Sequence, residues 1–240
     1  MTEKQKDKNI YRVFSVDRLF EIFNSKQLTL VRPKLWDDPF ENVIMNSTGE
    51  LESGEIFTID SRNNFYGQCW TYTNESDAIW RIYAPNKDGV RVRTTPRKLL
   101  KSLYERSDEF RDLHCFIGKV DYYSKKRLNA LLSNSKTISS WLLDSTGVGQ
   151  AMTLLFKRYA FMHENEVRIL YNSNGKVKSD LFKYSIDPID LIEDIVFDPR
   201  MDYKKFRTHK SDLKKLGFKG RIVKSNLYTV PKLNFKLVTQ

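Results

Sequence analysis

Three features of the sequence predict an α+β fold. The 240 residues are 40% hydrophobic and 13% aromatic, enough apolar material for a globular core. Strand-like and helix-like segments are interspersed, but they do not follow the regular β–α–β order of a parallel-sheet protein. No internal repeat or low-complexity linker divides the chain. We therefore expect a single domain over residues 1–240, with a basic C-terminal portion at 200–240.

The N-terminal segments set this pattern. Residues 11–15 (YRVFS) predict a strand, Ser15 is placed to cap a helix over 16–25, and 28–32 (LTLVR) predict a second strand. Residues 46–64 are polar and predict a surface excursion. The later elements are expected in this order: strand 65–73, helix 76–84, strand 89–95, helix 96–110, strand 114–123, a helical stretch 124–144, an amphipathic helix 149–161, strands 167–171, 181–186 and 192–197, helix 203–216, and strand 221–228.

Cysteine and histidine usage limits the class of protein. Cys69 and Cys115 are the only cysteines, which argues against a disulfide framework, and no apolar run reaches the roughly 18 residues that span a bilayer. The N-terminus, MTEKQKDKNI, lacks the apolar core of a signal peptide. His114, His163 and His209 are scattered, so no metal is expected. We predict a cytoplasmic protein without membrane contact.

The net charge of +11 is concentrated at the C-terminus. Residues 200–240 contain 12 Lys or Arg against two acids, so they carry +10. This asymmetry favours a polyanionic partner, nucleic acid before membrane, and the alternative is an ordinary solvated surface. Tyr203 and Phe206 could stack on unpaired bases. The residues expected to contact phosphates are Lys204, Lys205, Arg207, Lys210, Lys214 and Lys215.

A pair of acids stands at the entrance of the predicted strand 167–171. Glu164 and Glu166 are two residues apart, so in a strand they would project from one face and repel each other. Arg168 follows on the same face and could offset that repulsion. The alternative is an exposed, charged strand edge. No GxxxxGK[ST] or GxGxxG nucleotide loop is present.

The order of three motifs gives this pair a chemical meaning. Arg12 lies on the first strand, Thr71 on a middle strand, and Glu-x-Glu enters a late strand, an order that resembles the Arg–Ser–Glu class of ADP-ribosyltransferases. The resemblance implies mixed sheets with flanking helices and NAD⁺ as a substrate. It implies that Arg12 holds the phosphate and ribose of NAD⁺, that Thr71 steadies the site, that Glu166 binds the nicotinamide ribose, and that Glu164 orients the attacking group or accepts its proton. The middle motif is Cys69-Trp70-Thr71 rather than Ser-Thr-Ser, which leaves the role of Thr71 open.

The chemistry explains why carboxylates are wanted. Cleavage between nicotinamide and ribose builds positive charge on the sugar, and a fixed carboxylate stabilises that charge where it develops. The second acid can then act as a base toward the acceptor.

Two further segments are expected at the cofactor site. Trp80 and Tyr83 lie three residues apart on one helical face and are predicted to sandwich a nicotinamide or adenine ring, the alternative being that they anchor the core. The loop 37–41 (DDPFE) has turn chemistry and is expected either to shape the pocket or to close it.

The chain also resembles an uncharacterised bacterial family found in phage-defence loci. The similar pieces are YRVFS, LTLVRPKLWDDPFEN, CWT, AIWRIYAPNKDGVRV, ENEVRIL, IEDIVFDP and RIVKSNLY. The resemblance extends to the CmdT-type messenger-RNA ADP-ribosyltransferase toxins of toxin–antitoxin–chaperone systems. It implies a toxin that modifies RNA and is neutralised by an antitoxin, with a chaperone as a further partner. Two alternatives stay open: a non-catalytic nucleic-acid-binding module, and an ADP-ribosyltransferase that acts on protein.

Overall fold

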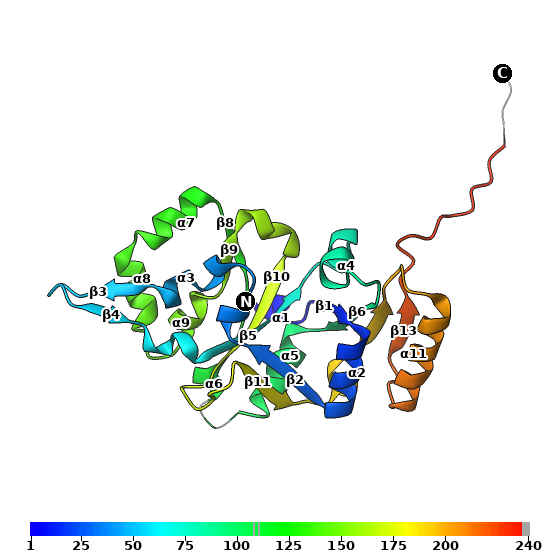
Figure 1. Cartoon of the computed structure of the whole chain (residues 1–240), viewed down its shortest axis with the longest axis horizontal. Coiled ribbons are helices and arrows are strands. Elements are labelled where there is room, and N and C mark those ends of the chain that lie inside the picture. The colour runs from blue at the N-terminus through cyan, green and yellow to red at the C-terminus, as the bar shows by residue number, and fades with distance from the viewer. Residues whose placement is uncertain (108, 110, 237–240) are drawn as a thin grey trace, which may run out of the picture.

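The computed structural model describes residues 1–107, 109 and 111–236 (Figure 1). Strands and helices interleave along the chain, so the predicted α+β class is confirmed. The strands are β1 (Ile10–Ser15), β2 (Gln27–Val31), β3 (Thr48–Glu50), β4 (Ile56–Thr58), β5 (Phe65–Thr71), β6 (Gly89–Thr94), β7 (Cys115–Lys119), β8 (Asp121–Tyr123), β9 (Phe156–Arg158), β10 (Glu166–Asn172), β11 (Leu181–Ser185), β12 (Asp194–Phe197) and β13 (Arg221–Lys224). The α-helices are α1 (Glu3–Lys6), α2 (Val16–Ser25), α3 (Val43–Asn46), α4 (Asp77–Tyr83), α5 (Pro96–Tyr104), α6 (Arg111–His114), α7 (Lys125–Leu132), α8 (Ser135–Leu142), α9 (Val148–Met152), α10 (Pro188–Leu191) and α11 (Tyr203–Lys215). Short 3-10 turns are η1 (Pro33–Leu35), η2 (Pro39–Asn42), η3 (Asp60–Asn63) and η4 (Tyr159–Glu164).

A nine-stranded sheet organises the molecule. Its main path runs β11-β2-β5-β1-β6-β12-β13, and β10 branches from β5 to pair with β7. All of these pairs are antiparallel except β12 with β13. In Figure 1 the sheet crosses the molecule, with α2 and α11 toward one end and α7, α8 and α9 toward the other.

The helix that follows β1 shows how local sequence positions these strands. The Ser15 side chain accepts a hydrogen bond from the Arg18 backbone N–H and so begins α2, as predicted. Leu19, Ile22 and Phe23 then face the core at helical spacing. The largest buried cluster packs α2 against the central strands β1, β5 and β6, and Val92 on β6 is one of its fully buried members.

The predicted amphipathic helix over 149–161 is wrong. Only Val148–Met152 is α-helical, and Phe156–Arg158 instead forms a strand that pairs in parallel with β8. Lys157 on that strand is buried among carboxylates. Strand pairing and these ion pairs outweigh the helical periodicity of the segment.

Smaller boundary differences have similar causes. The single strand predicted at 114–123 is two strands, since β7 joins the main sheet and β8 pairs with β9. The excursion 46–64 contains the exposed hairpin β3–β4. The helix predicted over 96–110 is α5 to Tyr104, and its predicted end at residue 110 lies outside the described residues. The last strand stops at Lys224 rather than at 228.

Candidate active site

The sheet is split between β1 and β5. These strands pair at one position only, Tyr11↔Thr71, whereas β1 pairs with β6 from Ile10↔Thr94 to Ser15↔Gly89. On the other side, β5 pairs with β10 along its whole length. The two strand groups therefore diverge from this pair toward Val13 on β1 and Cys69 on β5, and a pocket opens where backbone pairing stops.

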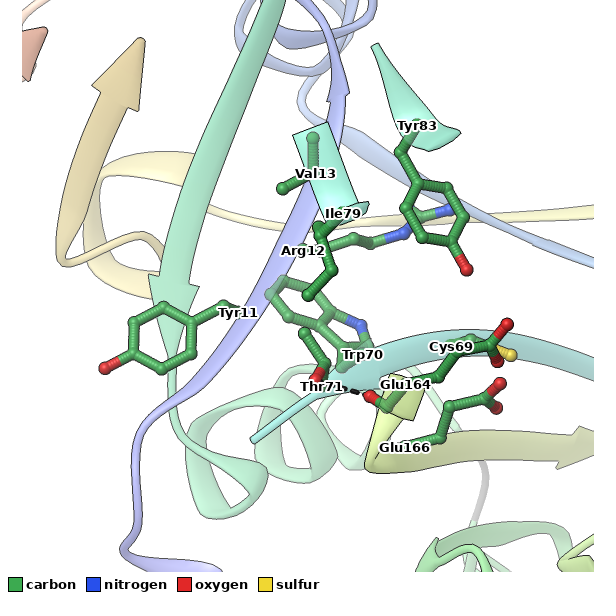
Figure 2. Close-up of a pocket in the computed structure, with 10 residues that line it drawn as sticks. All are labelled: Tyr11, Arg12, Val13, Cys69, Trp70, Thr71, Ile79, Tyr83, Glu164 and Glu166. Carbon is green, nitrogen blue, oxygen red and sulfur yellow. Dashed lines mark hydrogen bonds between the residues drawn. The ribbon is translucent and has the colours of Figure 1, made fainter. Parts of the chain in front are cut away.

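Five of the six residues predicted for catalysis and cofactor binding line this pocket: Arg12, Thr71, Tyr83, Glu164 and Glu166. Figure 2 shows the two glutamates side by side with their carboxyl groups pointing the same way, and Tyr83 and Arg12 approaching from the opposite side. The cavity volume is about 120 Å³. A cavity of that order accommodates one small aromatic ring.

Arg12 brings an unneutralised cation into the pocket. Its side chain is half-buried and its guanidinium carbon lies 5.6 Å from the centre of the Phe14 ring. Among the residues that the structure describes, no carboxylate forms an ion pair with it. Burial lowers the pKa of Arg12 below its ordinary value, because the charge is poorly solvated. An anionic group bound in the pocket would relieve that cost.

Glu166 lies in a buried charge cluster that consists of three acids and two bases. Its Oε1 is 2.8 Å from the Lys157 Nζ, and its Oε2 is 2.8 Å from the Arg168 Nε. Glu41 contacts the same two bases, with 2.9 Å between its Oε1 and the Lys157 Nζ, and an ion pair with Arg168. Glu164 completes the charge cluster through an ion pair with Lys157. Arg168 thus offsets the glutamate repulsion, as the sequence predicts.

The pKa values of the two glutamates are shifted in opposite directions. Burial alone would raise the pKa of Glu166, but the hydrogen bond from Glu164 and the charges of Arg168 and Lys157 lower it below its ordinary value. Burial and the hydrogen bond to Glu166 raise the pKa of Glu164 to about 8, although Lys157 opposes this shift. Near neutral pH, Glu166 is therefore the anion, whereas the raised pKa of Glu164 lies close enough to neutrality for that side chain to take up and release a proton.

Thr71 fastens the corner that carries these acids. Its hydroxyl donates to the Glu164 backbone carbonyl over 2.6 Å and accepts from the Thr73 N–H over 2.9 Å. Asn165, between the glutamates, adopts a left-handed backbone conformation with φ 45°. The hydroxyl therefore acts on the backbone of the Glu-Asn-Glu turn, which is a steadying arrangement.

The two aromatic residues of α4 have different environments. Tyr83 is 47% exposed and its ring lines the pocket. Trp80 is 1% exposed, packs in a cluster with Val13 and Ala84, and donates its indole N–H to Glu75 over 2.7 Å. An enclosed ring cannot stack on a ligand, so the structure places Trp80 as a core anchor and contradicts its prediction as a cofactor contact.

The basic helix α11 lies at the far edge of the sheet from the glutamates, beside β13 (Figure 1). Phe206 is buried against Phe197, so the predicted stacking of bases on Phe206 is wrong, whereas Tyr203 is exposed. Lys210 is half-buried, with its Nζ 5.7 Å from the centre of the Phe206 ring. The other predicted phosphate contacts are exposed: Lys204, Lys205, Arg207, Lys214 and Lys215.

Sequence reasoning missed two members of the charge cluster. The helical pattern over 149–161 places Lys157 in a helix, and the turn chemistry of the loop 37–41 gives Glu41 no role of its own. That loop shapes the site, because Glu41 joins the charge cluster and Asp38 pairs with Arg158 over 2.9 Å. The available signal was that Glu164 and Glu166 needed more than one cation to be buried together.

Within the described part of the chain, no group of three His, Cys, Asp or Glu side chains is arranged to hold a metal ion. No helix among these residues has the length and apolar character required to cross a bilayer.

Comparisons with known proteins give one partial family match and distant structural likenesses. A family model described as a protein of unknown function (DUF2971) matches residues 79–169, from α4 into β10 and less than half of the chain. A search of curated proteins found no match. The chain is similar to DarT from Thermus sp. 2.9 in complex with NAD⁺, at 12% identity and a TM-score of 0.40, over 91% of this chain and 95% of that chain. It is also similar to that protein in complex with ADP-ribosylated ssDNA, at 11% identity and a TM-score of 0.41, over 91% and 94% of the two chains. At such TM-scores the likeness does not indicate a shared reaction, so the chemistry of this chain is inferred from its own pocket.

Proposed function

We propose that this chain is an NAD-dependent ADP-ribosyltransferase that uses the split-sheet pocket and modifies nucleic acid. One observation carries the proposal: Arg12, which forms no ion pair with any carboxylate of the described residues, lines the same small pocket as the paired glutamates Glu164 and Glu166. A donor with an anionic phosphate, a ribose and a cationic ring matches those groups.

The pocket suits the nicotinamide end of the dinucleotide. Its volume of about 120 Å³ is on the order of one ring, so the rest of the donor would extend outward. Tyr83 and Ile79 supply apolar surface for the ring. Arg12 is placed to bind a phosphate oxygen, for which a guanidinium is well suited.

The glutamates divide the chemical work. As the bond from ribose to nicotinamide breaks, its electron pair leaves with the ring and positive charge develops on the sugar. The Glu166 anion accepts a hydrogen bond from the ribose and stabilises that charge. The acceptor then bonds to the ribose carbon, and its proton passes to Glu164 in its deprotonated form. Lys157 and Arg168 hold both carboxyl groups in place.

Charge distribution supports a nucleic-acid acceptor. Residues 200–240 carry +10, and five of the six basic residues singled out on α11 are exposed. We propose that this surface attracts a polyanion through counterion release. The acceptor is proposed to be messenger RNA. ADP-ribosylated ssDNA, the nucleic acid named in the DarT complex, is the competing acceptor that the experiment must include.

The test is transfer of label from adenylate-labelled NAD⁺ to single-stranded RNA, single-stranded DNA or cell protein. We expect nuclease-sensitive label in RNA. Glu166→Gln should reduce transfer by about 10²–10³-fold, because an anion that stabilises the transition state is lost. Glu55→Gln, an exposed glutamate in the β3–β4 hairpin, is the matched control and should transfer normally. Label only in protein would refute the nucleic-acid acceptor. Full activity of Glu166→Gln would refute the catalytic assignment, and nucleic-acid binding without NAD⁺ consumption would favour a binding module.

We further propose that the enzyme is a toxin of bacterial antiviral defence, held in check by an antitoxin and assisted by a chaperone. Expression of the native chain in bacteria should then arrest growth, whereas Glu166→Gln should not. Equal growth with both chains would refute the toxin role.

A further inference from the structure

A second hollow lies at the end of β5 and β10 and is lined only by neutral polar and cationic side chains. Its volume is about 290 Å³. The residues that line it are Gln5, Lys8, Asn9, Tyr72, Lys119 and Asn165. No carboxylate is among them, although the chain has 30 acidic residues.

The hollow and the pocket share two chain segments. Tyr72 directly follows Thr71, and Asn165 lies between Glu164 and Glu166. The Tyr72 backbone N–H donates to the Asn165 carbonyl over 3.0 Å and so extends the pairing of β5 with β10. Adjacent Cα atoms are about 3.8 Å apart and successive strand residues project to opposite faces, so the hollow lies at the same end of β5 and β10 as the glutamates but on the other face of the sheet.

No acid of the described residues neutralises the two lysines of the hollow through an ion pair. The nearby acids Glu3 and Asp7 are bound by Arg97, at 3.0 and 2.6 Å. Within the described part of the chain, neither Lys8 nor Lys119 forms an ion pair, and both are exposed. The Tyr72 hydroxyl donates to the Gln5 carbonyl over 3.2 Å and so fixes the N-terminal segment as one wall.

We propose that this hollow binds the phosphate backbone of a single-stranded nucleic acid and thereby presents the acceptor to the pocket. The inference rests on the proposed function for the meaning of the neighbouring pocket, but binding itself does not require it. Two lysines match phosphate charge, and the Asn9 and Asn165 amides can donate to phosphate oxygens. A single strand is required, because a base paired in a duplex cannot reach a narrow pocket.

The test measures binding of fluorescent single-stranded RNA and single-stranded DNA by anisotropy, without NAD⁺, over a range of salt concentrations. The Lys8→Glu/Lys119→Glu variant should lose affinity on the order of tenfold, and the slope of log affinity against log salt should fall by about 0.7 for each lost contact. The matched control is Lys125→Glu/Lys126→Glu on α7, which changes charge equally at two exposed lysines outside both hollows. It should lose less than about twofold. The RNA and DNA arms show which strand is preferred.

Three results would overturn the proposal: unchanged affinity in the Lys8/Lys119 variant, equal losses in both variants, or no binding of either strand by the native chain. Circular dichroism checks folding, and Lys8→Gln/Lys119→Gln provides a milder variant with the same expected direction. Because the assay omits NAD⁺, its failure would leave the transferase proposal standing, and loss of transferase activity would not affect its result.

Discussion

Arg12 and Arg168 stand on opposite sides of the split sheet and illustrate two uses of a buried cation. Arg168 is fully buried, pairs with Glu166 and Glu41, and donates to the Leu154 carbonyl over 2.8 Å. Arg12 is half-buried and, within the described residues, lacks any ion pair. On the β10 side of the split, Glu166 and Glu41 therefore neutralise the charge of Arg168. On the β1 side, the charge of Arg12 is left available to a ligand.

Replacing Arg168 should have the largest effect. Arg168→Met leaves Glu166 and Glu41 buried with Lys157 as their one remaining basic partner among the described residues, so we expect the free energy of unfolding to fall by about 3–5 kcal/mol. Urea denaturation measures this change. Arg12→Met is the matched control and should cost about 1 kcal/mol or less, because no buried partner is left behind. Equal destabilisation by the two substitutions would show that Arg168 and Arg12 do not differ in how much the folded state depends on their charge.

For NAD⁺ binding, in contrast to stability, we expect replacement of Arg12 to have a large effect. Arg12→Gln removes the free cation, and a hydrogen bond to a charged group contributes about 1.5–3 kcal/mol, so NAD⁺ affinity should fall roughly 10- to 100-fold. Calorimetric titration of the folded variant measures the affinity. Arg12→Lys should recover only part of it, because an ammonium lacks the planar fork of a guanidinium. Native affinity in Arg12→Gln would remove Arg12 from the binding site.

The charge cluster should also make stability depend on pH. The pKa of Glu164 is about 8 in the folded protein against 4.5 ordinarily, so between those values the folded state binds more protons than the unfolded state. Stability should therefore fall as pH rises through this window, by at most about 1.4 kcal/mol per pH unit for this one proton. Glu166 acts oppositely: its lowered pKa contributes stability above pH 4.5 that is lost in acid.

Glu164→Gln provides the control for this pH dependence. Its free energy of unfolding, measured by urea denaturation at several pH values, should show a flatter slope between pH 4.5 and 8. Glu41, whose pKa burial also raises, should supply a residual slope of the same sign. A variant slope as steep as the native one would assign the titration to another group.

The sequence predicted elements better than it predicted burial. Local signals such as the Ser15 cap determine α2, and β-branched, aromatic and other apolar residues favour β1, β5 and β10, so the strands that carry Arg12 and Thr71 are predicted correctly. The helix over 149–161 failed because the partners of Lys157 come from η2, η4 and β10, and a local window contains no such information.

The candidate site shows the same limit. Strand periodicity predicts that Glu164 and Glu166 lie together, but the structure brings them together differently, since Glu164 ends η4 and the left-handed Asn165 joins it to β10. Periodicity also cannot show that the sheet splits beside them, because the split depends on pairing between segments far apart in sequence. Helical spacing likewise grouped Trp80 with Tyr83, although only tertiary packing decides which ring remains exposed.

The smallest predicted effect tests that last distinction on α4. Tyr83→Ala removes the exposed ring from the pocket, and an aromatic contact contributes about 1 kcal/mol, so NAD⁺ affinity should weaken roughly fivefold. Tyr83→Phe keeps the ring and should bind nearly as the native protein does. Ile82→Ala, at an exposed neighbour outside the pocket, controls for changes in the helix itself. If Ile82→Ala weakened binding as much as Tyr83→Ala, the effect would come from helix stability, and the β1 side would contribute its charge to the ligand but no ring.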